Sequence, residues 1–250
     1  MPTHIAAARR TAALESVLGY LSDLSETIER VNVDPIVDVV RVLEEAFAEG
    51  STVYIAGNGG SAATASHFAV DLAKTVRGYP PGPPSDGFQV WSLADNAGLI
   101  TAWANDEGYD RVFSEQVLRA GKPGDVLIVI SGSGNSGNVV KAVEAAQEQS
   151  MITIGFLGMG GGKLGPMVDY PVVIQSDDYG VIEDAHMVLV HLIARHFRLV
   201  DKKKLKKETR QIVRESNGVT PPLRLHGGIE RKRNKHGRWI VTRTNSRNGA

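Results

Sequence analysis

The chain has 250 residues, no cysteine, and 28 basic against 28 acidic side chains. The lack of cysteine excludes disulfides and thiolate metal sites, and no apolar run approaches the roughly 20 residues that a membrane-spanning helix needs. A hydrophobic content of 42% is enough for one sizeable core, so we expect one main domain in a cytoplasmic protein without a secretory signal.

Two helices are expected at the start of the chain, near residues 8 to 30 and 35 to 49. Apolar residues at helical spacing mark one face of the first helix, and a face of this kind must be covered by the same subunit or by another one. The stripe consists of Ala13, Leu14, Val17, Leu18, Leu21, Leu24 and Ile28.

Five short apolar runs follow and alternate with helical patterns. Val, Ile and Leu fill the central runs without polar alternation, which is typical of a parallel sheet covered on both faces. The sequence therefore predicts an α/β fold, a three-layer α/β/α sandwich around a five-stranded parallel sheet. The strands are expected near residues 53 to 56, 88 to 93, 126 to 130, 152 to 157 and 171 to 174.

Two glycine-rich loops follow two of these strands. The first, GNGGSAATASHF over residues 57 to 68, runs into a helix, whose unpaired N–H groups favour an anion. The second, SGSGNS over residues 131 to 136, adds three hydroxyl donors. Both loops lie at carboxyl ends of parallel strands, so they predict a phosphate ester site. The candidate binding residues are Asn58, Gly59, Ser61, Ser131, Ser133 and Ser136.

Other interpretations of these loops are less favoured. A glycine loop alone can serve only to pack a helix closely against a sheet. Gly57, Gly59 and Gly60 do not have the spacing of a dinucleotide fingerprint, and the next strand comes too late for its ribose-binding acid. No Gly-Lys-Ser/Thr follows either loop, so a P-loop is also excluded.

Histidines and acids on two helices form a candidate metal site. His67 and Asp71 are four residues apart, which puts them on one helix face. Alone, such a pair is more often a solvated hydrogen bond. The last helix adds Glu183, Asp184 and His186 as well as His191, whose apolar neighbours imply a partner or a function.

Several motifs in one order carry a family resemblance. They are the GNGGSAA loop, the helix with His67, the segment 105 to 108, the SGSGNS loop and the segment 160 to 164. Over about residues 8 to 198 the chain resembles the sugar isomerase (SIS) domain family, and within it the phosphoheptose isomerases. The resemblance implies a homotetramer, built partly by the N-terminal helices, with sites at subunit interfaces.

The resemblance also implies a divalent metal, usually zinc. Mapped by position, its ligands would be His67, Asp71, Glu183 and His191. Asp71 is one methylene shorter than the Glu of the family, and Glu183 replaces a neutral Gln, so the site would be more negative. Helical rotation brings Asp184 closer to the face of His191 than Glu183, which makes Asp184 the reserve candidate. His186 is expected in the neighbourhood or at an interface.

The implied reaction is isomerisation of sedoheptulose 7-phosphate to D-glycero-D-heptose 7-phosphate through an enediol. Asp71 would be the base, His191 the acid–base partner, and Asn105 and Asp106 would bind the sugar, although a capping role suits Asp106 equally well. The competing hypothesis is a non-catalytic SIS adaptor that binds a partner protein or nucleic acid.

The last 50 residues differ in charge from the rest. Residues 201 to 250 hold 15 basic against 4 acidic residues, whereas residues 1 to 200, the expected SIS domain, hold 13 against 24. The run Lys202 to Lys207 is expected to end the last helix, and a small hairpin could turn near residues 234 to 237. A solvated tail is the favoured interpretation; self-docking onto the acidic body and nucleic-acid contact, through this segment alone, remain alternatives.

Overall fold

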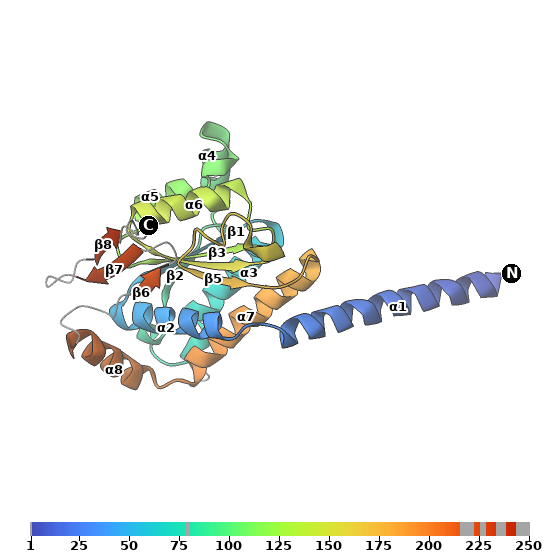
Figure 1. Ribbon diagram of the computed structural model, residues 1–250, viewed down its shortest axis with the longest axis horizontal. Helices are drawn as coiled ribbons and strands as arrows, with labels where there is room; N and C mark the ends of the chain where they lie inside the picture. Colours follow the sequence, from blue (N-terminus) through green and yellow to red (C-terminus); the bar gives the residue numbers. More distant parts are fainter. Residues whose placement is uncertain (1, 79–80, 216–222, 226–228, 234–238, 244–250) are drawn as a thin grey trace, which may run out of the picture.

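The computed structural model describes residues 2–78, 81–215, 223–225, 229–233 and 239–243. A five-stranded sheet with the order β2-β1-β3-β4-β5 forms its centre, and every neighbouring pair is parallel (Figure 1). The predicted α/β fold with a five-stranded parallel sheet is therefore confirmed. The strands are β1 (Thr52–Gly57), β2 (Gln89–Ser92), β3 (Val126–Ser131), β4 (Ile152–Leu157) and β5 (Tyr170–Val173).

Both faces of the sheet are buried under helices, because successive strand residues point to opposite sides. Val53 and Ile55 pack into one apolar cluster, and Tyr54 and Ala56 into the other. The first cluster joins the sheet to α2 (Asp34–Glu49), α3 (Gly59–Ala73) and α7 (Tyr179–Leu199), and the second joins it to α5 (Ser114–Ala120) and α6 (Gly137–Glu148). Short 3₁₀ turns connect these layers: η1 (Thr75–Arg77), η2 (Pro84–Asp86), η3 (Tyr109–Arg111) and η4 (Met159–Gly161).

The strand order creates a crevice between β1 and β3. From β1 the chain continues through α3 to β2 on one side, and from β3 it continues through α6 to β4 on the other. The two connections leave in opposite directions and cover opposite faces, which is the topological switch point where open α/β sheets bind ligands. Both glycine-rich loops lie at this edge.

Helix α1 (Pro2–Glu29) extends away from the body (Figure 1). Most of its apolar stripe is uncovered in the single chain: Leu14, Val17, Leu18 and Leu21 are each 56–57% exposed, whereas Ile28 packs against the core. Near its base, the Tyr20 hydroxyl donates to Asp184 Oδ2 at 2.6 Å, and this hydrogen bond raises the pKa of Tyr20 to about 12. The stripe is therefore available to another polypeptide.

Helix α4 (Ala97–Asp106) is only partly covered, because Ile100, Trp103 and Ala104 are half-buried against the second apolar cluster. The Asn96 side chain caps it by accepting a hydrogen bond from Leu99 N at 3.1 Å. None of its residues is buried, although Leu99, Ile100 and Trp103 are apolar. It stands above the α5–α6 layer in Figure 1.

The segment after α7 folds differently from the expectation. Helix α7 ends at Leu199, and the lysine run begins a separate helix, α8 (Lys202–Glu215), so the prediction that this run ends the last helix is wrong. Asp201 explains the break, because its carboxylate accepts from the N–H groups of Lys203 and Lys204 and so starts a new helix.

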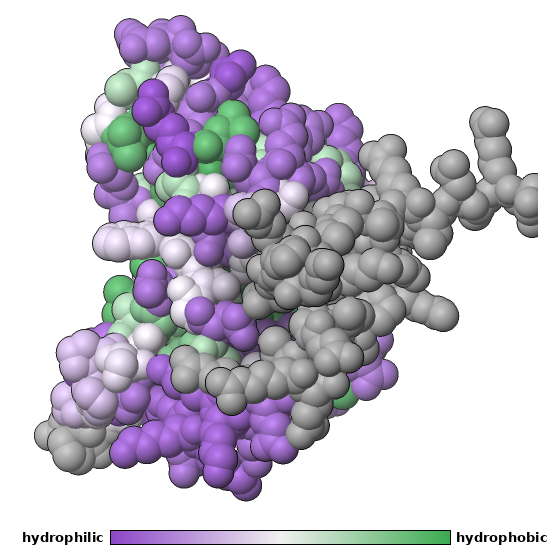
Figure 2. Space-filling view, turned by 90° about the vertical axis from the view of Figure 1, so that its left-hand side faces the viewer, coloured by the Kyte–Doolittle hydropathy of each residue, from purple (hydrophilic) through white to green (hydrophobic). Residues whose placement is uncertain are grey.

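Helix α8 is amphipathic and packs on α2. Leu205 and Thr209 are buried, and Lys206 Nζ donates to the Ser85 carbonyl at 2.9 Å while lying 4.3 Å from the centre of the Phe47 ring. Lys203, Lys204 and Lys207 are exposed, and α8 contributes to the hydrophilic lower surface in Figure 2. Three antiparallel strands follow, β6 (Leu223–Leu225), β7 (Ile229–Arg233) and β8 (Trp239–Arg243). The predicted turn at residues 234 to 237 lies outside the described residues.

No helix in the described part of the chain is both long enough and apolar enough to cross a membrane.

His186 gives the core a titratable group. It is fully buried on α7, and neither ring nitrogen has a hydrogen-bond partner among the described residues. Burial lowers the pKa of His186 from 6.5 to about 4, and the nearby Leu157 backbone opposes the shift only partly. The imidazole is therefore neutral in the folded protein at pH 7.

We expect the stability of the protein to fall as the pH is lowered through this range. Because the unfolded chain takes up the proton near pH 6.5 and the folded chain only near pH 4, His186 should cost about 2 kcal/mol of stability between pH 7 and pH 5. Urea unfolding of the wild type and of His186→Leu at both pH values measures this. The variant should lose less stability on acidification, and an equal loss in both proteins would contradict the assignment.

Candidate active site

The two glycine-rich loops present the starts of two helices to the crevice. Asn58 is the N-cap of α3 and Ser136 is the N-cap of α6, and neither side chain makes a capping hydrogen bond. The first-turn N–H groups of both helices are thus not occupied by their own caps. Ser61 and Ser131 are buried beside them. This is an arrangement that favours a bound anion.

A pair of amides joins the first loop to the second layer of helices. Asn58 Nδ2 donates to Asn138 Oδ1 at 2.8 Å, and Asn138 Nδ2 donates back to Asn58 Oδ1 at 2.9 Å. The Tyr109 hydroxyl also donates to Asn58 Oδ1, at 3.1 Å. The spacing between the two helix starts is therefore fixed by side chains. Sequence analysis missed Asn138 and Tyr109; an asparagine in the first turn after the SGSGNS loop was the available signal.

The second loop is supported by the glycine-rich turn after β4. Gly134 has a φ of +63°, and a Cβ there would overlap the carbonyl oxygen of Gly161. Gly162 approaches the Ser133 carbonyl in the same way. Hydrogen bonds from Leu164 N to Gly134 O and from Lys163 N to Asn135 Oδ1, both 3.0 Å long, lock the two turns together. The segment 160 to 164 thus shapes the serine loop.

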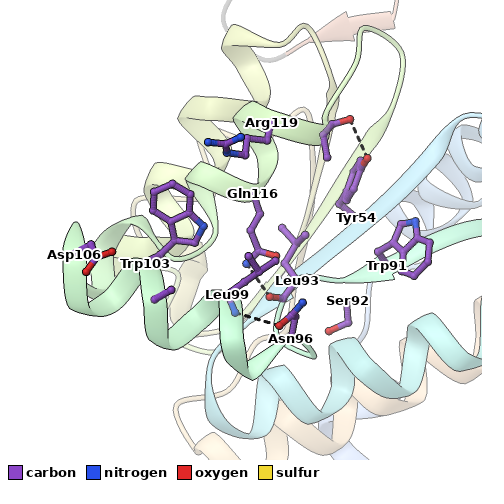
Figure 3. A pocket seen from close by; sticks show the side chains of 12 residues that line it. Tyr54, Trp91, Ser92, Leu93, Asn96, Leu99, Trp103, Asp106, Gln116 and Arg119 are labelled. Atoms are coloured by element: carbon purple, nitrogen blue, oxygen red, sulfur yellow. Dashed lines mark hydrogen bonds between the residues drawn. The ribbon is translucent and has the colours of Figure 1, made fainter.

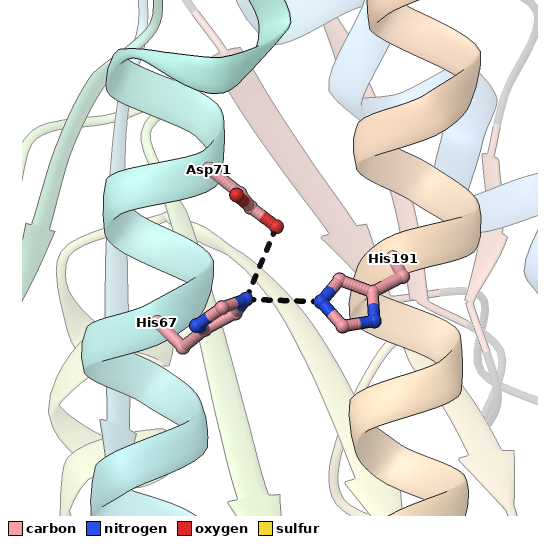
Figure 4. Close-up of side chains that lie close together, drawn as sticks. All are labelled: His67, Asp71 and His191. Atoms are coloured by element: carbon pink, nitrogen blue, oxygen red, sulfur yellow. Dashed lines mark hydrogen bonds and ion pairs between the residues drawn. The ribbon is translucent and has the colours of Figure 1, made fainter.

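Two helices bring His67, Asp71 and His191 together. His67 and Asp71 project from α3 and His191 from α7, and the three side chains point toward one another (Figure 4). His67 Nε2 lies 3.0 Å from His191 Nε2 and 3.4 Å from Asp71 Oδ2. Asp71 is buried, whereas both imidazoles are exposed. Residues 67 and 191, far apart in sequence, therefore share one site.

The donor set of this group suits a divalent cation. One ligand atom from each of the three residues lies within 4.8 Å of the other two. A tetrahedral zinc ion with Zn–N distances of about 2.0–2.1 Å would separate two nitrogens by about 3.3 Å, close to the observed separation. Two imidazoles and one carboxylate also leave a fourth position open, as in catalytic sites.

Glu183 and Asp184 lie outside this group. A Cβ at Gly60 would overlap the Glu183 carboxylate, so Glu183 lies at the first turn of α3, on the loop side of His67. Asp184 is exposed and accepts the hydrogen bond from Tyr20. His186 faces the core next to Phe156, not the group. The structure therefore does not bring the fourth predicted ligand, or its reserve, to the other three.

Asn105 and Asp106 lie at the end of α4, beside a different cavity. Asn105 Nδ2 donates to Asp106 Oδ1 at 2.7 Å. Asp106 lines a cavity of about 670 Å³ together with Trp91, Trp103 and Arg119 (Figure 3). Arg119 lies over the Trp103 ring, 5.9 Å from its centre. Within one chain these two candidate sugar-binding residues are not part of the group on α3 and α7.

Comparisons with known proteins show the family of the chain. A profile of the SIS domain family matches residues 18–158. The chain is 40% identical to the phosphoheptose isomerase of Trichlorobacter lovleyi over 159 residues, which cover 64% of this chain and 79% of that protein. It is 35% identical to the phosphoheptose isomerase of Aliarcobacter butzleri over 189 residues, which cover 74% and 95%.

A solved structure of a phosphoheptose isomerase is also similar to this chain. The structure of phosphoheptose isomerase GmhA from Neisseria gonorrhoeae superposes with a TM-score of 0.69 at 31% identity, covering 75% of this chain and all of that one. The parallel sheet, the loops at its switch point and these similarities agree. The chain is a member of the SIS domain family.

Proposed function

We propose that this chain is a sugar-phosphate isomerase that converts sedoheptulose 7-phosphate to D-glycero-D-heptose 7-phosphate through an enediol. One observation carries the proposal: the anion-binding starts of α3 and α6 lie at one edge of the sheet, and later turns of α3, together with α7, hold His67, Asp71 and His191. The relatives named phosphoheptose isomerases support the substrate.

The phosphate of the substrate is assigned to the two loops. Backbone N–H groups at the starts of α3 and α6 would donate to it, together with the hydroxyls of Ser61, Ser131, Ser133 and Ser136. Asn58 and Gly59 would shape the first loop around it. The Asn58–Asn138 pair keeps the two halves of this cradle at a fixed separation.

The reacting carbons are assigned to the group on α3 and α7. His67 is seven residues after Gly60, which corresponds to about 10 Å along the helix, a distance that a phosphorylated sugar chain can span. Asp71 takes the proton from the carbon next to the carbonyl, and His191 exchanges a proton with the carbonyl oxygen. Return of the proton to the neighbouring carbon completes the isomerisation, without a redox cofactor.

His67, Asp71 and His191 would hold a divalent metal, and we assign zinc, with Glu183 as a fourth ligand if its side chain turns toward the group. When bound, the metal supplies a positive charge that stabilises the oxyanion. The side chain of Asp71 is one methylene shorter than that of a glutamate. The distance from its carboxylate to the substrate therefore depends on the position of α3.

Removal of the metal should abolish the activity and lower the melting temperature. Because three ligand atoms converge within 4.8 Å, loss of the cation leaves the buried Asp71 carboxylate with less compensation. Dialysis against a chelator, elemental analysis and a thermal melt measure this, and adding back Zn²⁺ or Mn²⁺ identifies the active ion. Full activity in metal-free protein would contradict the assignment.

We assign a homotetramer with sites at subunit interfaces. The exposed part of the α1 stripe and the partly covered α4 support it, since α4 carries Asn105 and Asp106, which would reach the site of a neighbouring subunit. Light scattering should give the mass of four chains, and a monomeric mass would contradict the assignment.

Isotope exchange tests the function. The metal-loaded protein is incubated with sedoheptulose 7-phosphate in deuterated water, and the product is followed by NMR. Deuterium at C2 of the aldose is the expected result, because the enediol exchanges its proton with solvent. No turnover would favour the non-catalytic adaptor, an alternative that the phosphoheptose isomerase relatives do not favour.

A further inference from the structure

A second cavity opens on the far side of the histidine group from the glycine loops. It has a volume of about 400 Å³ and is bounded by His67, Asp71 and His191 on one side and by Thr75, Arg195 and Arg198 on the other. Arg195 and Arg198 follow His191 on α7 by four and seven residues, so the three side chains share one face of the helix.

The two arginines are exposed and not neutralised. Neither guanidinium forms an ion pair with a carboxylate in the part of the chain whose side chains the structure describes. The neighbouring His196 differs, because its ring lies 2.8 Å from Glu44 Oε1. Two guanidinium groups that line one cavity, each with five N–H donors, are suited to a phosphate or a carboxylate.

The order of side chains along α3 and α7 indicates which part of a bound sugar would carry the anionic group that contacts the arginines. From the loops outward, the two helices present Gly60 and Glu183, then His67 and His191, then Asp71 and Arg195. Thr75, in η1 after α3, and Arg198 come last. A ligand whose phosphate lies in the glycine loops thus has its reacting end at the histidines. The arginines can contact only a substituent beyond that end, where sedoheptulose 7-phosphate carries no charge.

We infer that the cavity lined by Arg195 and Arg198 binds a second phosphate group, at the end of the sugar opposite to the one held by the glycine loops. The inference rests on the proposed function, because it uses the orientation of the sugar assigned there. It predicts that a sugar bisphosphate occupies the whole groove and competes with the monophosphate substrate.

Calorimetry with non-reacting analogues tests this. The probes are the alditols made by reducing sedoheptulose 7-phosphate and sedoheptulose 1,7-bisphosphate, together with inorganic phosphate. The bisphosphate should bind about tenfold more tightly than the monophosphate, which is the effect of one charge-assisted contact, and the advantage should shrink at high salt. Inorganic phosphate reports the loop cradle, so its affinity should be the same in the wild type and in the arginine variants.

The double variant Arg195→Gln/Arg198→Gln should lose the advantage of the bisphosphate and keep the affinity for the monophosphate. Arg119→Gln is the control, because it removes one positive charge on α5, away from α7, and should keep the advantage. Equal binding of the two analogues by the wild type, or an advantage that survives in the double variant, would overturn the inference.

Turnover of sedoheptulose 7-phosphate by the same preparations separates this inference from the proposed function. Turnover without any preference for the bisphosphate would overturn the second-phosphate site alone. A preference that depends on the two arginines, in protein without turnover, would support the site and overturn the isomerase assignment.

Discussion

Replacing His191 by alanine should lower kcat for sedoheptulose 7-phosphate by about a thousandfold, within the range of general acid–base catalysis. The change removes an imidazole nitrogen 3.0 Å from His67 Nε2, and with it one of the three converging ligand atoms. Asp71→Asn should cause a loss of the same order, because the amide keeps the size of the carboxylate and cannot accept the proton. Steady-state kinetics on metal-loaded protein measures both effects.

His196→Ala is the control for this loss. His196 lies on the same helix, but it pairs with Glu44 and is not part of the metal-binding group. The kcat of His196→Ala should equal that of the wild type. Circular dichroism should show that all variants are folded. A His191→Ala protein within about tenfold of the wild-type kcat would remove His191 from the chemistry.

Replacing Gly134 by alanine should lower kcat/KM by about a hundredfold, through loss of the phosphate cradle. At a φ of +63° the new Cβ would overlap the Gly161 carbonyl oxygen, and two backbone segments cannot both stay in place. The serine loop then moves away from the start of α6. The loss should appear mainly in KM and in the affinity for inorganic phosphate.

Gly160→Ala separates this displacement from simple backbone strain. Gly160 has a similar φ of +72°, but no atom lies within 4 Å of the Cβ that it would gain. It shares the conformational cost of about 1–2 kcal/mol and should leave the loop in place. An equal loss of kcat/KM in both variants would attribute the effect to strain, against the close-approach explanation.

The parallel sheet could be predicted because its strands are continuous apolar runs. Each of the five strands begins and ends within one residue of the prediction, since glycines or turn residues follow the runs. The end of α7 was harder to predict, because its helical sequence pattern continues across Leu199 into the lysine run of α8. Only the cap made by Asp201 separates them, and an acid before a lysine run is a weak signal in a sequence.

The site was predictable in part. The i, i+4 spacing of His67 and Asp71 and the polar His191 in an apolar stretch pointed to the group that the two helices form. Spacing could not tell Glu183 from Asp184, and neither belongs to the group, because Glu183 lies beside the start of α3 and Asp184 contacts Tyr20. The mutual amide pair of Asn58 and Asn138 joins residues 80 positions apart, which no local pattern reveals.

That amide pair links the anion cradle to both helix layers of the fold. Asn58 begins a helix that packs on one face of the sheet, and Asn138 lies in a helix that packs on the other. The anion cradle is therefore complete only after both layers have docked. We expect inorganic phosphate to slow unfolding in stopped-flow experiments and to leave the refolding rate unchanged, because the ligand meets its site only after the main barrier. A refolding rate that rises with phosphate would mean that the cradle closes before the barrier is crossed.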